Sequence, residues 1–75
     1  MYSSLMNPLA IGEKIRERRK LLKLRQRDLA ELAGVTLRVL TDLEQGRANP
    51  TLSQLAKIAE VLGLEIRLQE KSADA

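Results

Sequence analysis

The side chains of this chain that could do chemistry are mostly cationic, and they are concentrated in one stretch. Residues 13–27 hold eight Lys and Arg and two Glu, a net charge of +6. Residues 1–12 are uncharged and the whole chain carries +3, so the residues after 27 sum to −3. Such a concentration of ammonium and guanidinium groups is typical of a surface that contacts phosphate. A charge run alone is more often a solvated helix face, so a motif has to support a nucleic-acid partner.

Several kinds of chemistry are excluded by the composition. The chain has no cysteine and no histidine, which removes disulfides, thiolates, imidazole catalysis and nearly every zinc site. No carboxylates cluster beside a glycine-rich loop, so we expect no enzyme, no metal and no cofactor. No apolar run approaches the roughly 18–20 residues of a membrane helix, and the first residues lack the pattern of a secretory signal. We therefore expect a soluble cytoplasmic protein with no membrane contact, associated with the nucleoid if it binds DNA.

The length of 75 residues allows one domain at most. A chain this short buries only about 60–65% of its unfolded surface, so it often depends on a partner. Its one aromatic residue is Tyr2, so the core must be aliphatic, as in packed helices. We expect a flexible lead-in at residues 1–7, a single domain at 8–70 and a frayed tail at 71–75.

The first helix is predicted to begin near Leu9 and to end near residues 22–23. Pro8 and Gly12 place its start, because proline is tolerated in a first turn. Its apolar residues at helical spacing are Ile11, Ile15 and Leu22.

Two short helices with a tight turn between them follow. The first spans 26–33 and stops at Gly34, where a left-handed backbone suits glycine. Thr36 offers an N-cap for the next helix, which runs to about Glu44 and is closed by Gly46. Their apolar positions are Leu29, Leu32, Ala33, Val39, Leu40 and Leu43. Such a pair can cross at nearly a right angle, and its second helix can then lie in a major groove about 12 Å wide.

That crossing needs particular residue types, and the chain supplies them. A small residue, Ala30, falls where the helices approach closely, and Gly34 makes the turn. Apolar anchors are needed at Leu29, Ala33, Val35, Leu40 and Leu43.

A fourth helix is predicted after a loop at residues 47–50. Thr51 and Gln54 fit a capping box, in which each side chain serves the other's backbone donor. Gly63 ends the helix. The residues expected to face the core are Leu52, Leu55, Ala56, Ala59 and Leu62.

Four segments together carry a resemblance to a family. They are RQRDLAELAGVT at 25–36, DLEQG at 42–46, NPTL at 49–52 and LAKIAEVLGL at 55–64. In this order and spacing the chain resembles the Xre and Cro/repressor helix-turn-helix proteins over roughly residues 11–64. The resemblance implies an all-α, lambda-repressor-like bundle of four to five short helices that binds operator DNA. One position departs from the family pattern, because Arg25 stands where a Thr or Ser usually caps the second helix, at a cost of about 1 kcal/mol.

The resemblance also implies which residues contact bases. They lie on the exposed face of the recognition helix and are Thr36, Leu37, Arg38, Thr41 and Asp42. Arg38 is the candidate for bidentate binding of guanine O6 and N7, worth about 1–3 kcal/mol of discrimination. Thr36 and Thr41 could bond phosphate or base, and Leu37 could contact a thymine methyl. Asp42 is expected either to accept from a cytosine amino group or to hold Arg38 in place.

Further residues are implied to contact the DNA backbone or to support the fold. Gln26 matches a residue that hydrogen-bonds a phosphate in family members. Arg25 is either a phosphate contact that compensates for the lost cap or an ordinary exposed arginine. Arg47 and Asn49 are candidates for phosphate contact or plain loop residues. The phosphate set is thus Arg25, Gln26, Arg47 and Asn49, and Arg19 and Glu44 match a partly buried structural ion pair.

The spacing of the apolar residues changes from a helical period to a period of two at residues 64–69, where Leu64, Ile66 and Leu68 alternate with polar residues. This pattern predicts a short β-strand, and a lone strand needs a neighbour. We therefore expect antiparallel pairing across a two-fold axis in a homodimer, on half-sites about 34 Å apart. The alternative is a disordered tail.

The LGLEIRL run at 62–68 also resembles the terminal strand of HipB-type antitoxins. This resemblance implies a dimeric repressor of its own operon that binds a toxin such as a HipA-type kinase. The alternatives are a stand-alone or prophage Xre-type regulator without a toxin, and a protein-interaction module that has lost DNA binding.

Overall fold

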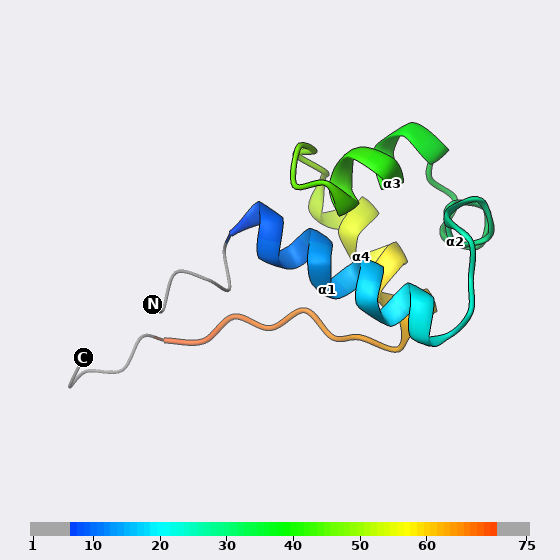
Figure 1. The fold of residues 1–75 in the computed structure, drawn as a ribbon. Helices are drawn as coiled ribbons and strands as arrows, with labels where there is room; N and C mark the ends of the chain where they lie inside the picture. The colour runs from blue at the N-terminus through cyan, green and yellow to red at the C-terminus, as the bar shows by residue number, and fades with distance from the viewer. Residues whose placement is uncertain (1–6, 71–75) are drawn as a thin grey trace.

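The computed structural model describes residues 7–70 and contains four helices in this range (Figure 1). They are α1 (Pro8–Leu21), α2 (Gln26–Ala33), α3 (Leu37–Glu44) and α4 (Leu52–Leu62). α1 packs against α3 and α4, and α2 packs against α3 and α4. The prediction of a bundle of short helices is confirmed. None of the four helices is long and apolar enough to cross a membrane. The predicted tail at 71–75 and residues 1–6 of the predicted lead-in lie outside the described residues.

The start of α1 lies next to the predicted Leu9 but differs from the prediction at Asn7, which was expected to belong to the flexible lead-in, and at Gly12. Asn7 is its N-cap, and the Asn7 side-chain oxygen accepts a hydrogen bond of 2.8 Å from the N–H of Leu9. Gly12 lies inside the helix and is buried, so its assignment to the helix start is wrong. A Cβ at this position would clash with the carbonyl oxygen of Leu43 and lie 3.0 Å from that of Glu44. Gly12 therefore lets α1 touch the backbone at the end of α3.

The turn between α2 and α3 has the predicted geometry. Gly34 has φ of 71°, in the left-handed region, and Thr36 caps α3 by accepting from the N–H of Val39 at 3.1 Å. At α4 the predicted capping box forms, with both hydrogen bonds between Thr51 and Gln54 at 3.0 Å. These ends form locally, because each requires only residues within a few positions.

The core is aliphatic and is formed by all four helices. Its buried residues are Ile15, Leu29, Ala30, Ala33, Leu40, Leu43, Ile58, Ala59 and Leu62. Leu22 and Leu32 are 42% and 63% exposed, although they continue the apolar patterns of their helices.

The core face of α4 differs from the prediction. Ile58 is fully buried, whereas Leu52 is 71% exposed and Ala56 is also exposed. The expectation that Leu52 and Ala56 face the core is therefore wrong. The α4 sequence contains two neighbouring apolar stripes, and packing against α1 and α2 buries the one through residues 55, 58, 59 and 62. Leu55, Ala59 and Leu62 therefore face the core as predicted.

Residues 64–70 are extended and run back along α1, on the side of the bundle away from α3 (Figure 1). The N–H of Leu64 bonds to the carbonyl oxygen of Ala59 at 2.8 Å and closes the end of α4. Within the described residues this segment pairs with no strand, so the β-strand predicted at 64–69 is not formed by the single chain. The physical reason is that a ladder needs a second strand, which the rest of residues 7–70 does not offer.

Candidate nucleic-acid interface

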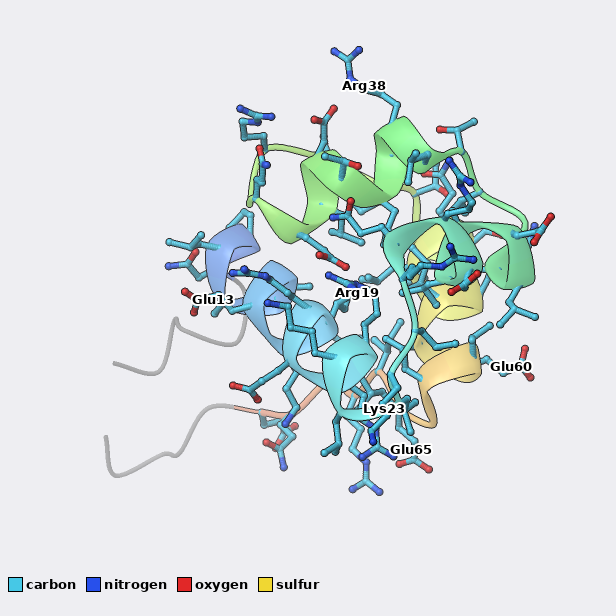
Figure 2. The ribbon with its side chains drawn as sticks, turned by 45° about the vertical axis from the view of Figure 1, so that its right-hand side comes forward. Glu13, Arg19, Lys23, Arg38, Glu60 and Glu65 are labelled. Atoms are coloured by element: carbon cyan, nitrogen blue, oxygen red, sulfur yellow. The ribbon has the colours of Figure 1, made fainter. Side chains whose placement is uncertain are left out.

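The outer side of α3 presents Arg38, the one cation of the predicted base-contacting set. Arg38 projects from α3 away from the body of the protein (Figure 2), and its side chain is 86% exposed. Leu37, its neighbour in the first turn, is 45% exposed. Thr36 is exposed too, although its hydroxyl oxygen already accepts the N–H of Val39 as a helix cap. A guanidinium and an apolar side chain are therefore displayed side by side on the first turn of α3.

Asp42 lies one turn further along α3 and contacts two arginines. Its carboxylate accepts from Arg38 Nε at 3.1 Å and from Arg47 Nη2 at 3.4 Å. The Asp42 side chain is 27% exposed, and the two arginines are far more open to solvent. Asp42 thus orients one guanidinium from α3 and one from the loop after it, and the group of three keeps a net charge of +1. Asn49, further along the loop, is exposed.

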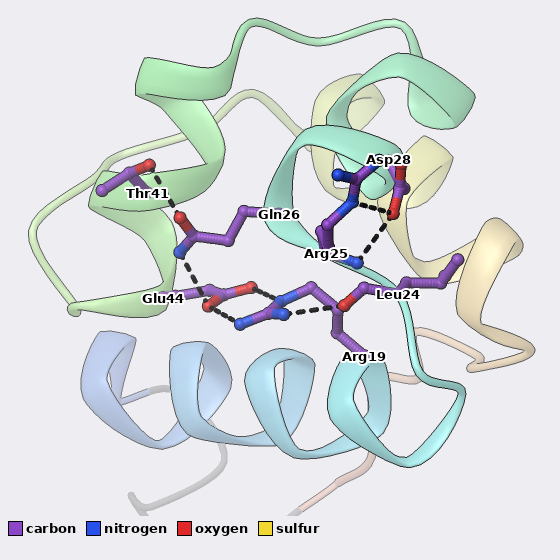
Figure 3. Close-up of polar contacts among 7 residues, drawn as sticks. All are labelled: Arg19, Leu24, Arg25, Gln26, Asp28, Thr41 and Glu44. Atoms are coloured by element: carbon purple, nitrogen blue, oxygen red, sulfur yellow. Dashed lines mark hydrogen bonds and ion pairs between the residues drawn. The ribbon is translucent and has the colours of Figure 1, made fainter.

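Thr41 points toward α2 rather than outward. Its hydroxyl donates to the side-chain oxygen of Gln26 at 3.4 Å, and Gln26 Nε2 donates to Glu44 Oε1 at 3.0 Å (Figure 3). Gln26 is therefore held by two residues of α3 at the point where α2 begins. Its amide nitrogen has two hydrogens, so one donor remains beyond the bond to Glu44.

Arg19 and Glu44 form a buried ion pair that joins α1 to the end of α3. Arg19 Nε and Nη2 donate to the two Glu44 oxygens at 2.6 and 3.0 Å, and Arg19 Nη1 donates to the carbonyl oxygen of Leu24 at 2.8 Å (Figure 3). The side chains are only 10% and 2% exposed. The hydrogen bonds that Arg19 donates to Glu44 raise the pKa of Arg19 above its ordinary value, so the guanidinium stays charged. Within the described residues, no buried side-chain nitrogen or oxygen lacks a partner.

Arg25 at the N-cap of α2 is paired with Asp28 within the same turn. Asp28 accepts the backbone N–H of Arg25 at 2.9 Å and two side-chain bonds from its guanidinium at 3.0 and 3.1 Å. The bond from the Arg25 N–H to Asp28 is one half of a capping box. In the other half a Thr or Ser hydroxyl would accept a backbone N–H of α2, and here the Arg25 side chain forms an ion pair with Asp28 instead. The bonds from the Arg25 guanidinium, followed by the bond from its backbone N–H, hold the pKa of Asp28 below its ordinary value. Arg25 is nevertheless exposed at the start of α2.

The basic stretch at 13–27 does not form a single cationic face. Arg19 is buried in its ion pair, and Arg18 Nε donates to the carbonyl oxygen of Leu62 at 2.8 Å, at the end of α4. Lys23 lies at the end of the molecule opposite Arg38 (Figure 2). The role of Arg18 was not predicted from the sequence, because a charge count does not show which carbonyl groups need a donor. The link between Gln26 and Glu44 was also missed, since 18 positions separate the two residues.

Comparison with known proteins places this geometry in a family. The family model described as helix-turn-helix matches residues 15–69, which include α2, the Gly34 turn and α3. The chain belongs to the helix-turn-helix family. Its resemblance to Xre-type helix-turn-helix proteins is thereby confirmed, and α3 holds the position of the recognition helix.

The relatives of this helix-turn-helix chain include regulators and a repressor. A helix-turn-helix transcriptional regulator of Methanothermobacter thermautotrophicus is 49% identical over 51 residues, which cover 68% of this chain and 74% of that protein. The regulator y4mF of Sinorhizobium fredii is 36% identical over 66 residues, 88% of this chain and 87% of that protein. The immunity repressor protein of Bacillus phage phi105 is 40% identical over 58 residues, 77% of this chain, and the chain spans 40% of its length. The names describe transcriptional regulators and a repressor, and none of the three describes an enzyme.

Proposed function

We propose that this protein is a sequence-specific DNA-binding repressor that inserts α3 into a major groove and reads guanine with Arg38. The observation that carries the proposal is the 86% exposed Arg38 side chain on the recognition helix, oriented by Asp42 one turn away. Two donors of a guanidinium match the two acceptors of guanine in the major groove. Leu37 next to Arg38 offers an apolar contact for a thymine methyl, and Thr36 keeps a hydroxyl donor for phosphate or base. Asp42 serves mainly to hold Arg38.

Phosphate contacts on both sides of α3 complete the proposed interface. Gln26 keeps a free amide hydrogen at the start of α2, and the exposed guanidinium of Arg25 precedes it. On the other side, Arg47 and Asn49 extend from the loop that follows α3. Backbone contacts of this kind fix the register of a protein on DNA, while base contacts specify the sequence. Thr41 contributes indirectly, by holding Gln26.

Repression by this protein is proposed to require a homodimer, formed through the apolar positions Leu64, Ile66 and Leu68. Helix-turn-helix dimers bind two half-sites about one DNA turn apart. Substitution Ile66→Asp places a charge in the proposed contact and is expected to give a monomer by sedimentation at micromolar concentration. A dimer that persists in this variant would contradict the role of the segment.

Our more specific proposal is an autoregulating antitoxin that acts at the nucleoid and binds a toxin such as a HipA-type kinase. Its support is the resemblance of the 62–68 run to HipB-type proteins. A toxin-like gene beside this one, and co-purification of its product, would be expected. A stand-alone or prophage regulator is the alternative, and the likeness to the phage phi105 immunity repressor favours it. The third hypothesis, an interaction module that has lost DNA binding, relied on the acidic Asp42, whose charge is balanced here by two arginines.

The experiment that tests the proposed function is a salt titration of binding to the DNA upstream of the protein's own gene. Wild type is expected to bind well below micromolar, with an affinity that falls steeply as salt rises. Arg38→Ala should lose about 5- to 150-fold of its preference over random DNA, which corresponds to about 1–3 kcal/mol. The matched control is Lys23→Gln, which removes one positive charge at the opposite end of the molecule and should keep the preference. A wild type without preference for this DNA would contradict autoregulation.

A further inference from the structure

The side of the molecule away from α3 carries exposed apolar residues in a regular arrangement. Leu64 packs partly on the core, while Ile66 is 43% and Leu68 is 89% exposed. An open groove of about 490 Å³ lies between this segment and α4, with Ala56, Ala59, Leu64 and Ile66 in its lining. Leu64, Ile66 and Leu68 therefore form one apolar face. Leu64 and Ile66 are directed toward the groove beside α4, and Leu68 at the end of the face is almost fully exposed.

The odd-numbered side chains of the segment carry charges of opposite sign. Arg67 donates to Glu65 at 2.9 and 3.0 Å, and the two side chains are 75% and 73% exposed. Positions i and i+2 of an extended chain lie on the same face, so this pair is directed away from the apolar face. Because Glu65 precedes Arg67, a second copy of the segment that runs antiparallel can place each negative charge opposite a positive one.

The backbone of the segment is also available for pairing. The N–H of Leu64 is used by the carbonyl oxygen of Ala59, and beyond it no backbone hydrogen bond joins residues 65–70 to another described residue. An extended backbone with free donors and acceptors is a template for a neighbouring strand.

From these three observations we infer that residues 64–68 pair with the same residues of a second copy in one register, with the two-fold axis at Ile66. In this antiparallel register Leu64 lies opposite Leu68 of the second copy, and Ile66 lies opposite its own symmetry mate. Glu65 lies opposite Arg67 of the second copy, and this happens twice, so the four charges alternate in sign. The inference rests on the proposed homodimer and specifies how its two chains meet.

Neighbouring registers are disfavoured by charge and by pattern. A shift by two residues keeps the apolar face intact but places Glu65 opposite Glu65, or Arg67 opposite Arg67. Like charges directly opposite each other destabilise a strand pair. A shift by one residue places apolar side chains opposite charged ones on both faces. Only the register centred on Ile66 places apolar residues opposite each other on one face and opposite charges opposite each other on the other face. It also brings Leu68 of the second copy next to Leu64 at the edge of the groove.

The hydrogen-bonding phase of the pair follows from Leu64. In an antiparallel ladder, directly opposed residues alternate between exchanging two hydrogen bonds and exchanging none. Because the Leu64 N–H is already bonded to Ala59, the even-numbered pairs are those without hydrogen bonds. The amides of Glu65 and Arg67 are then donors to the second copy, and the amide of Ile66 faces solvent.

Charge exchange tests the register directly. We expect Glu65→Arg and Arg67→Glu each to raise the dimer dissociation constant roughly tenfold, because each variant replaces two attractive cross-strand pairs with two repulsive ones. The double variant Glu65→Arg/Arg67→Glu restores opposite charges in this register only, and its dissociation constant should return to within about threefold of wild type. Sedimentation equilibrium of the full chain measures all four, and circular dichroism confirms that each variant keeps its helices.

Three results would overturn the register or its hydrogen-bonding phase. The first is a wild type that stays monomeric at hundreds of micromolar, which also contradicts the proposed dimer. The second is a pair of single variants that dimerise like wild type while Ile66→Asp is monomeric, which leaves the proposed dimer intact with another register. The third comes from amide hydrogen exchange in the dimer, if Ile66 is protected while Glu65 and Arg67 exchange freely.

Discussion

Two ion pairs at opposite ends of α3 show how differently similar chemistry is used in this molecule. At the end of the helix, Glu44 receives two hydrogen bonds from Arg19 and one from Gln26, with side chains 2% and 10% exposed for the ion pair. In the first turn, Arg38 makes a single bond of 3.1 Å to Asp42, and its side chain is 86% exposed. Both pairs consist of an arginine and a carboxylate, but only the first is sealed from water.

The contrast separates a structural role from a binding role. A buried pair that loses one member leaves an uncompensated charge, which typically costs several kcal/mol. An exposed pair contributes little to stability, because water solvates both groups and the side chains lose entropy on pairing. Arg38 can therefore exchange Asp42 for a base edge at small cost, whereas Arg19 cannot leave Glu44. The buried pair keeps α1, α2 and α3 together so that the exposed pair is presented in a fixed place.

The largest expected effect is the loss of the buried pair in Arg19→Ala. The variant leaves Glu44 without its two bonds, and we expect the free energy of unfolding to fall by about 3–5 kcal/mol. Urea denaturation monitored by circular dichroism measures it. Lys20→Ala removes a positive charge at the adjacent exposed position of α1 and should stay within about 0.5 kcal/mol of wild type. A loss below about 1 kcal/mol in Arg19→Ala would show that Glu44 is not sealed as described.

A smaller loss of stability is expected for Gly12→Ala. The new methyl group meets the carbonyl oxygens of Leu43 and Glu44, which are backbone atoms that cannot turn aside. We expect about 1–3 kcal/mol of destabilisation in a thermal melt, against the gain that alanine usually brings inside a helix. Glu13→Ala, at the next position and exposed, is the control and should be neutral or slightly stabilising. A stabilised Gly12→Ala variant would mean that α1 and α3 do not touch there.

The exposed pair should respond in binding rather than in stability. Asp42→Asn weakens the hold on both Arg38 and Arg47 and removes one negative charge, so affinity for random DNA should rise and the salt dependence should steepen by about one phosphate contact. Preference for the specific site should fall several-fold, and the free energy of unfolding should change by no more than about 0.5–1 kcal/mol. Glu60→Gln on α4 makes the same charge change away from Arg38 (Figure 2) and is the control. An unaltered preference in Asp42→Asn would show that Asp42 does not orient Arg38.

The smallest effect is expected at the exposed pair of Arg25 and Asp28. The Arg25 guanidinium and backbone N–H lower the pKa of Asp28, so this carboxylate stabilises the folded state above its unfolded pKa. That contribution is lost as the pH falls through the lowered folded value, in the acid range below about 4. In Arg25→Ala the pKa of Asp28 should move up toward its ordinary value in an NMR titration, because the side-chain bonds are removed. An unchanged Asp28 titration would contradict the role of Arg25.

The parts of this fold that could be predicted from the sequence are those that depend on neighbouring residues. Gly34 and Thr36 define the turn and the start of α3 within three positions, and both behave as predicted. The core face of α4 was assigned incorrectly at Leu52, because either of two apolar stripes could be buried and only the packed helices decide between them. Gly12 shows the same limit, since its requirement for a hydrogen in place of a side chain comes from the backbone of α3.

In the candidate site, too, features that depend on neighbouring residues could be predicted, and features that depend on helix packing could not. The exposure of Leu37 and Arg38 follows from the period of α3 and its apolar side. Thr41 is turned toward Gln26 because of the angle at which α3 crosses α2, and residue spacing does not specify this angle. The strand predicted from the alternation at 64–69 needs a second chain, so a pattern within one chain can indicate it but cannot complete it.

The central claim, that α3 reads DNA sequence through Arg38, is tested most directly by selection from a random pool of double-stranded oligonucleotides. Wild type and Arg38→Ala are carried through the same rounds, and the enriched sequences are compared. We predict that wild type enriches two half-sites about 10 base pairs apart, each with an invariant guanine, and that Arg38→Ala loses this guanine while the rest of the motif weakens less. Enrichment of the same guanine by both proteins, or no enriched motif with wild type, would contradict the account.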